Sequence, residues 1–181
     1  MKKTVLVFGF ILGGLITTMM IYGTMQCCRN PEAKSNDVAG YAALIVAFSF
    51  IFIGIKNFRD KYNGGLISFG KAFRVGFFIS LIASTIYMIV WLFNYYLFTP
   101  EFIDKYTQHV LYVARTDGAS QLELEKKAAE MADLKQLYKN PLFVVLHSYI
   151  EVLPIGLVVS LISSLILKRV KRAAAPSATN Q

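Results

Sequence analysis

The apolar stretch from Leu142 to Leu167 places the strongest constraint on how this chain can fold. It is long enough to cross a bilayer, for which about 20 apolar residues suffice. Its interior nevertheless contains His147, Glu151 and Pro154. A charged carboxylate at the centre of a membrane helix costs roughly 2.5–3.5 kcal/mol, so such a group needs a polar partner or a function. The stretch therefore predicts a membrane helix that packs against other helices of the same chain.

Three further apolar runs can supply those packing partners, and they cover residues Thr4–Met25, Val38–Ile55 and Val75–Phe98. The first run follows two lysines, as a signal peptide does, but it is longer than a signal-peptide core of about 7–15 residues and lacks a small-residue cleavage site. We therefore expect it to be retained as a helix. The sequence predicts an all-α integral membrane four-helix bundle formed by residues 1–172, followed by a disordered cytoplasmic tail at 173–181.

The distribution of lysine and arginine predicts which ends of the helices face the cytoplasm. The segments before the first run, between the second and third runs, and after the fourth run contain many basic residues and one acid, Asp60. The positive-inside rule therefore puts both termini in the cytoplasm. The net charge of +8 is explained by topology, and we predict no nucleic acid partner. Lys71, Arg74, Lys168 and Arg169 are candidates for contact with lipid headgroups.

Residues 99–140, between the third and fourth runs, are predicted to form a helical hairpin outside the membrane. Thr99 and Pro100 have the sequence of a helix start, with Thr99 as the N-cap residue. Ser120 and Glu123 have the spacing of a capping box, which predicts that a second helix begins there. This segment is the part of the chain most suited to form a shape outside the bilayer.

Glu151 is the polar residue whose placement most needs an explanation. His147 lies four residues before it and therefore on the same face of a helix. We expect a protonated Glu151 to form a hydrogen bond with Tyr87 or Asn94 of the third run, which lie at a similar depth. Pro154 lacks an amide hydrogen and is expected to kink the helix. A structural role is the preferred interpretation, and proton or ion transport through Glu151 is the alternative.

Small residues recur every four positions in each of the four runs, which allows membrane helices to approach closely. This pattern predicts tight packing within the bundle and is compatible with a homo-oligomer or with binding to another membrane protein. The rows are Gly9, Gly13 and Thr17; Ala39, Ala43 and Ala47; Ala72, Gly76, Ser80 and Ser84; and Gly156, Ser160 and Ser164.

The sequence contains no recognisable set of catalytic or cofactor-binding residues. Gly65–Ala72 nearly matches a phosphate-binding loop, but alanine replaces the hydroxyl residue that holds magnesium, and no strand precedes the loop. His147 and Glu151 supply fewer ligands than the three or four that zinc needs. We therefore predict no metal and no cofactor. The preferred function is a non-enzymatic membrane scaffold or accessory protein that contacts lipids, and a lipid-modifying enzyme acting at the Gly64–Lys71 loop is a further alternative.

Cys27 and Cys28 are adjacent, just beyond the first run. Neighbouring cysteines form a strained disulfide, so we expect two unpaired thiols, although a bond within the pair or between molecules stays open.

Several short motifs together resemble a known family. They lie at Gly64–Gly76, Pro100–Tyr106, Tyr138–Pro141 and Glu151–Gly156. The chain is similar to the proteins of domain of unknown function 4199, four-span bacterial membrane proteins found mainly in Bacteroidetes. The resemblance implies a multi-pass protein of the bacterial inner membrane, and it implies no reaction and no functional residues.

Overall fold

The computed structural model describes residues 1–30, 32 and 37–169, and these residues form helices and connecting turns. The predicted tail at 173–181 lies outside the described residues. Within them there is no strand, and a single isolated antiparallel bridge joins Ile67 to Arg169. The elements are α1 (Lys2–Arg29), α2 (Asp37–Tyr62), α3 (Phe69–Phe93), the π-helix η1 (Asn94–Phe98), α4 (Phe102–Thr116), α5 (Gln121–Leu137) and α6 (Pro141–Leu167).

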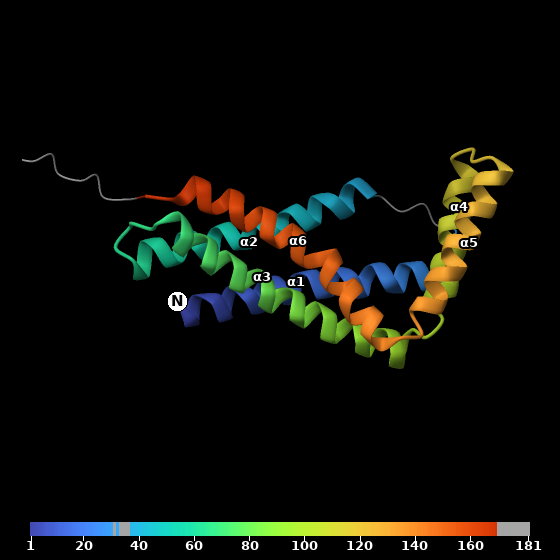
Figure 1. Ribbon diagram of the computed structural model, residues 1–181, viewed down its shortest axis with the longest axis horizontal. Helices are drawn as coiled ribbons and strands as arrows, with labels where there is room; N and C mark the ends of the chain where they lie inside the picture. Colours follow the sequence, from blue (N-terminus) through green and yellow to red (C-terminus); the bar gives the residue numbers. More distant parts are fainter. Residues whose placement is uncertain (31, 33–36, 170–181) are drawn as a thin grey trace, which may run out of the picture.

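The four long helices α1, α2, α3 and α6 run along the long axis of the molecule, and α4 and α5 lie across one end of them (Figure 1). Helices α2 and α3 each contact the other three long helices, and the contacts of α3 with α1 and α6 are the most extensive. Helices α4 and α5 pack against each other, and α4 also contacts α1. The fold therefore has a long helical body and a smaller helical pair at one end.

Three helical segments among the described residues are long and apolar enough to cross a membrane. They are Lys2–Arg29, Phe69–Phe98 and Pro141–Leu167. The predicted second span, Val38–Ile55, lies within α2, which is not among these three. The all-α prediction is confirmed, and the apolar helices are those of a membrane protein.

Helices α3 and α6 meet along a line of small residues, which we call the α3–α6 seam. A Cβ atom added to Gly76 would lie 2.8 Å from the Cβ of Ser160, and one added to Gly156 would lie 2.7 Å from the Cβ of Ser80. Each glycine thus makes room for a serine of the other helix. The Oγ atoms of Ser80 and Ser160 are 3.2 Å apart and share a hydrogen bond. The seam consists of Ala72, Gly76, Ser80, Ser84, Gly156, Ser160 and Ser164, all of them buried.

Helix α1 packs on α3 by the same principle, because two glycines of α1 receive isoleucines of α3. A Cβ at Gly9 would lie 2.8 Å from Ile82, and a Cβ at Gly13 would lie 2.8 Å from Ile86. The small-residue rows of α1, α3 and α6 are therefore occupied within one chain. In α2 the predicted row does not act as a continuous contact, since Ala43 is exposed.

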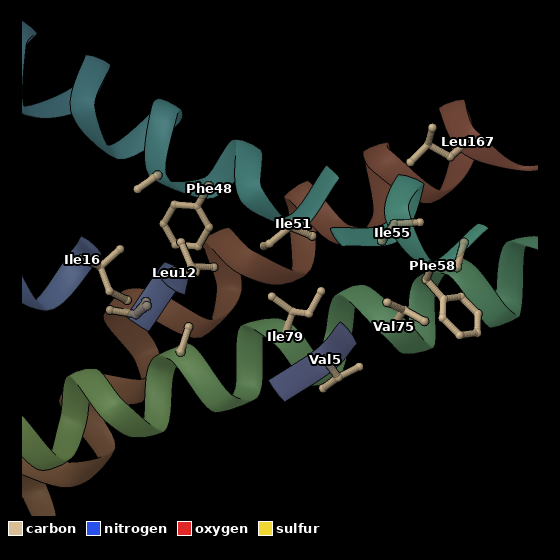
Figure 2. Packing of buried hydrophobic residues seen from close by; sticks show 14 of the residues in the cluster. Val5, Leu12, Ile16, Phe48, Ile51, Ile55, Phe58, Val75, Ile79 and Leu167 are labelled. Carbon is tan, nitrogen blue, oxygen red and sulfur yellow. The ribbon is translucent and has the colours of Figure 1, made fainter. Parts of the chain in front are cut away.

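The space between the four long helices is filled by apolar side chains. Leu12 of α1, Ile51 of α2 and Ile79 of α3 are 0% exposed, and Figure 2 shows them gathered between the helices with Phe48. Val152 of α6 belongs to the same cluster. The centre of the helical body is thus a close-packed apolar core.

The connection from α3 to α4 differs from the prediction. The backbone amide and the hydroxyl of Thr99 both donate to the carbonyl of Asn94, at 2.8 and 3.1 Å. Thr99 therefore terminates η1, and the N-cap residue of α4 is Glu101, so the predicted N-cap at Thr99 is wrong. Helix α4 begins after Glu101, because Pro100 and Glu101 form a turn between the two helices.

The predicted capping box at the start of α5 is confirmed. The amide of Ser120 donates to Glu123 Oε2 at 2.7 Å, and the amide of Glu123 donates to Ser120 Oγ at 3.4 Å. The Ser120 amide and, at 2.8 Å, the Ser120 hydroxyl both donate to the ionised carboxylate and lower the pKa of Glu123. At the start of α6, the side chain of Asn140 accepts a hydrogen bond from the amide of Leu142, so the chain turns back sharply there.

Candidate functional site

Glu151 forms a hydrogen bond with α3, and its partner is Tyr87. The Tyr87 hydroxyl donates to Glu151 Oε2 at 3.2 Å. Tyr87 is buried, whereas the Glu151 side chain is exposed on the outer surface of α6. Glu151 therefore lies at the edge of the packing between α3 and α6, with its carboxyl bonded to Tyr87.

Two other side-chain pairs join α3 to α6. Thr85 Oγ1 and the Tyr149 hydroxyl are 2.8 Å apart, and Ser80 pairs with Ser160 in the seam. Thr85 and Tyr87 are two positions apart and so point to opposite sides of α3. The bonds made by Thr85 and Tyr87 thus flank the seam on both sides, and Tyr87–Glu151 is one of three polar links between the same two helices.

Asn94 and Pro154, which the sequence also singles out, do not join this pair. The Asn94 side chain donates to Thr99 Oγ1 at 3.4 Å, within the π-helical turn. Pro154 lies inside α6 with its ring exposed, and it cannot donate to the carbonyl of Ile150.

His147 lies one helical turn before Glu151, among aromatic rings. Its ring stacks on Phe143 at a centroid distance of 5.6 Å and meets the edge of Tyr138 at 5.6 Å. Among the described residues, no three His, Cys, Asp or Glu side chains are grouped as metal ligands would be. His147 therefore packs among the aromatic rings at this end of α6.

Trp91 connects the end of α3 to the helical pair. It is 6% exposed, and its ring meets the edge of Phe102 at 5.0 Å and stacks on Tyr95 at 6.0 Å. Tyr138, at the end of α5, packs on Tyr95 at 5.4 Å. We call Trp91, Tyr95, Phe102, Tyr138, Phe143 and His147 the aromatic cluster.

Two tyrosines of the helical pair lie near Glu151 electrostatically. Burial, followed by the charge of Glu151, raises the pKa of Tyr138 well above its usual value. Burial also raises the pKa of Tyr106, with smaller contributions from Cys27 and Glu151.

The opposite end of the long helices carries the predicted lipid-contact residues. The backbones of Ile67 and Arg169 exchange two hydrogen bonds of 2.8 Å, which fasten the loop before α3 to the end of α6. Lys71 donates to the side chain of Asn63 at 2.6 Å. The fold thus brings Lys71 and Arg169 to one end, and the other two predicted residues, Arg74 and Lys168, lie there as well, all four exposed.

Two hollows in the described part of the chain are not evident from the sequence. One, of about 230 Å³, is apolar and lies between α2 and α6, lined by Ile45, Phe48, Ser49, Ile155 and Val159. The other, of about 730 Å³, lies between α4 and α5 and is lined by Tyr106, His109, Val110, Val113, Ala114, Asp117, Gly118, Ala119, Glu123 and Lys127. The one sequence signal for the second hollow is the turn at Gly118, whose φ of 84° favours glycine. Neither hollow is lined by Tyr87 or Glu151.

Cys27 and Cys28 both carry free thiols and are partly exposed near the end of α1. The adjacent pair therefore does not form a disulfide in this structure.

A comparison with protein families agrees with the motifs in the sequence. A family model described as protein of unknown function (DUF4199) matches residues 7–169. No curated protein and no solved structure is detectably similar to the chain. The match runs from α1 to Arg169, the residue that pairs with Ile67. Because it covers most of the chain, the protein belongs to the DUF4199 family, a family of unknown function.

Proposed function

We propose that this protein is a non-enzymatic accessory protein of the bacterial inner membrane, which crosses the bilayer four times with both termini in the cytoplasm. In this arrangement α4 and α5 form an outer helical hairpin that binds a partner protein. The observation that carries the proposal is the division of the molecule into a closed apolar body and a helical pair with a hollow of its own.

The packing of α2 supports a fourth span. Ala47, Phe48, Ile51 and Ile55 of α2 are buried in the same core as side chains of α1, α3 and α6. Helix α2 therefore lies among three helices that are each long and apolar enough to span a membrane. Its exposed side chains next to this core include Ile45, Val46 and Ile53, which suit a hydrocarbon environment.

The filled core favours an accessory role over transport. A transporter needs a polar path through its helices, and in transporters the binding site commonly lies between repeated halves near the bilayer midplane. Here Leu12, Ile51 and Ile79 close the centre, and Glu151 faces outward from α6. The loop at Gly64–Lys71 is bound to the end of α6 through Ile67, which favours a structural role for that loop over lipid chemistry.

One labelling experiment tests the orientation and the partner together. In a background with Cys27→Ser and Cys28→Ser, Ala119→Cys puts a thiol in the hollow between α4 and α5. A membrane-impermeant maleimide with a photoreactive group should label it in spheroplasts and then cross-link it to one discrete protein. Lys61→Cys should be labelled only after lysis. Labelling of Ala119→Cys only after lysis would overturn the orientation.

The cross-link itself needs a control on the same helical pair. Leu122 is 77% exposed and does not line the hollow. Leu122→Cys should be labelled from outside equally well but should give no cross-linked product. If both positions give the same products, or if neither gives one, the helical pair does not bind a partner through the hollow.

Substitution of Glu151 separates a structural role from transport. Glu151→Gln keeps an acceptor for the Tyr87 hydroxyl, so it should melt near the wild type in detergent. Glu151→Leu leaves that buried hydroxyl unpaired and should cost roughly 0.6–2 kcal/mol, as interhelical hydrogen bonds in membranes do. If Gln melts as early as Leu, a charged Glu151 is required. In proteoliposomes both the wild type and Glu151→Gln should leave an imposed pH gradient intact, and proton uptake that depends on Glu151 would favour the transporter.

A further inference from the structure

The end of the long helices opposite α4 and α5 carries a concentrated positive charge, which we call the basic end. It consists of Lys56, Lys61, Lys71, Arg74, Lys168 and Arg169, all exposed. Asp60, in the last turn of α2, is the one acid among residues 56–74 and 165–169, and Arg59 binds it at 2.6 and 3.2 Å. The Asp60 carboxylate also interacts with Lys56 and Arg169, but one carboxylate among these cations leaves the basic end with an excess of positive charge.

The basic end is held in a fixed shape by the loop before α3. Ile67 is 1% exposed and exchanges two backbone hydrogen bonds with Arg169. The Arg59 guanidinium also donates to the carbonyl of Leu167 at 3.4 Å. The backbone segments that carry the cations are thus fixed to one another by buried side chains and backbone hydrogen bonds. Because these segments are already ordered, less entropy is lost when the cations bind a ligand.

Exposed aromatic side chains lie directly beside these cations. Gly70, Arg74 and Phe78 follow one another at four-residue spacing and so share a face of α3. Phe78 and Phe69 are both partly exposed, and a Cβ atom at Gly70 would meet no atom within 4 Å. Along this face an anionic group has access to Arg74 beside Gly70, and an apolar chain has access to Phe78 one turn deeper in the helix.

We infer that the basic end binds the headgroups of anionic phospholipids, with their acyl chains lying along the Arg74–Phe78 face of α3. The charge is complementary to a phosphate diester, and the aromatic residues continue toward the apolar part of α3. Nucleic acid would match the charge but not this apolar continuation, because its phosphates do not carry hydrocarbon chains. Free phosphate would use the cations alone.

The test uses the full-length protein in nanodiscs of phosphatidylcholine that contain a minority of spin-labelled phosphatidylglycerol. The wild type should immobilise phosphatidylglycerol in preference to spin-labelled phosphatidylcholine, and added salt should weaken the preference. In the double variant Arg74→Gln with Lys168→Gln, the preference for phosphatidylglycerol over phosphatidylcholine should fall about fivefold for each charge removed. Neither side chain is buried, and the wild-type salt titration tests the inference even if the variant is unstable.

A matched control removes the same charge from the other end of the molecule. Arg115→Gln with Lys139→Gln changes exposed residues of the α4–α5 pair and should leave the lipid preference unchanged. An equal loss in this control, or no preference in the wild type, would overturn the inference. Soluble glycerol phosphate should not displace the lipid, and displacement at the lipid's own concentration would instead indicate a site for free anions.

Discussion

Gly76→Ala should force α3 and α6 apart and lower the free energy of unfolding by about 3 kcal/mol, the upper part of the range for overpacking a core. The added Cβ would lie 2.7 Å from Ser160 Oγ, 2.8 Å from Ser160 Cβ and 3.0 Å from Ile55 Cδ1. The Ser160 Cβ is fixed to the backbone of α6, so it cannot move aside without moving the helix. Thermal unfolding in detergent, followed by circular dichroism, would measure the loss.

A second substitution should restore the fit. Ser160→Gly removes both Ser160 atoms that the new methyl group would strike, so Gly76→Ala with Ser160→Gly should recover much of the stability lost by Gly76→Ala alone. Gly14→Ala is the control on another helix, because nothing lies within 4 Å of a Cβ there. It should be neutral or slightly stabilising, as for glycine replaced in an open helical position. If Gly76→Ala melts like Gly14→Ala, α3 and α6 do not meet at Gly76.

Trp91→Ala should loosen the attachment of α4 and α5 to the membrane helices. It should lower the free energy of unfolding by about 3 kcal/mol. This is the lower end of the range for removing a buried tryptophan ring. The surroundings of a membrane helix are lipid and not water, so burying an apolar ring there gains less free energy. Trp91 contacts Phe102 of α4 and Tyr95 of η1, so its loss opens the aromatic cluster where these helices meet. Amide hydrogen exchange should rise in α4 before it rises in α3.

Two further variants separate the loss of packing from a general effect of losing an aromatic residue at this depth. Trp91→Phe keeps a ring against Phe102 and should cost less than Trp91→Ala. Phe93 is 58% exposed on the same helix, and Phe93→Ala should leave exchange in α4 unchanged. An equal rise in exchange for Phe93→Ala, or no rise for Trp91→Ala, would show that the aromatic cluster does not hold the pair in place.

The ends of the elements were predictable wherever a strong local signal exists. The sequence predicts a helix over 142–167, and α6 covers Pro141–Leu167, because Asn140 caps it through its own side chain. The capping box at Ser120 likewise fixes the start of α5. The start of α4 was misplaced by two residues, since the π-helical turn of η1 uses Thr99 to complete its own hydrogen bonds.

The pairing of helices was not predictable from the sequence. In a water-soluble helix the apolar face marks the buried side, but α6 is apolar all round, with exposed Ile150 opposite buried Val152. The rows of small residues showed which faces approach another helix closely, and not which helix that is. The same limit applies to the candidate site. Tyr87 is one of the two partners that the sequence predicts for Glu151, and the exposure of Glu151 depends on how α6 is rotated against α3.

The α3–α6 seam also has a consequence for how the protein is made. Ser80 and Ser160 are 80 residues apart, and a ribosome that adds about 5–20 residues per second needs roughly 4–16 s to produce the second after the first. During that interval the seam face of α3 lies against lipid or an insertion factor. Before Ser160 arrives, Ser80 Oγ can donate its one proton to the carbonyl of Gly76, 3.0 Å away within its own helix. Because of this bond the hydroxyl is already hydrogen-bonded when α3 enters the bilayer. Helix α3 therefore has no unpaired Ser80 donor in the lipid before α6 is inserted.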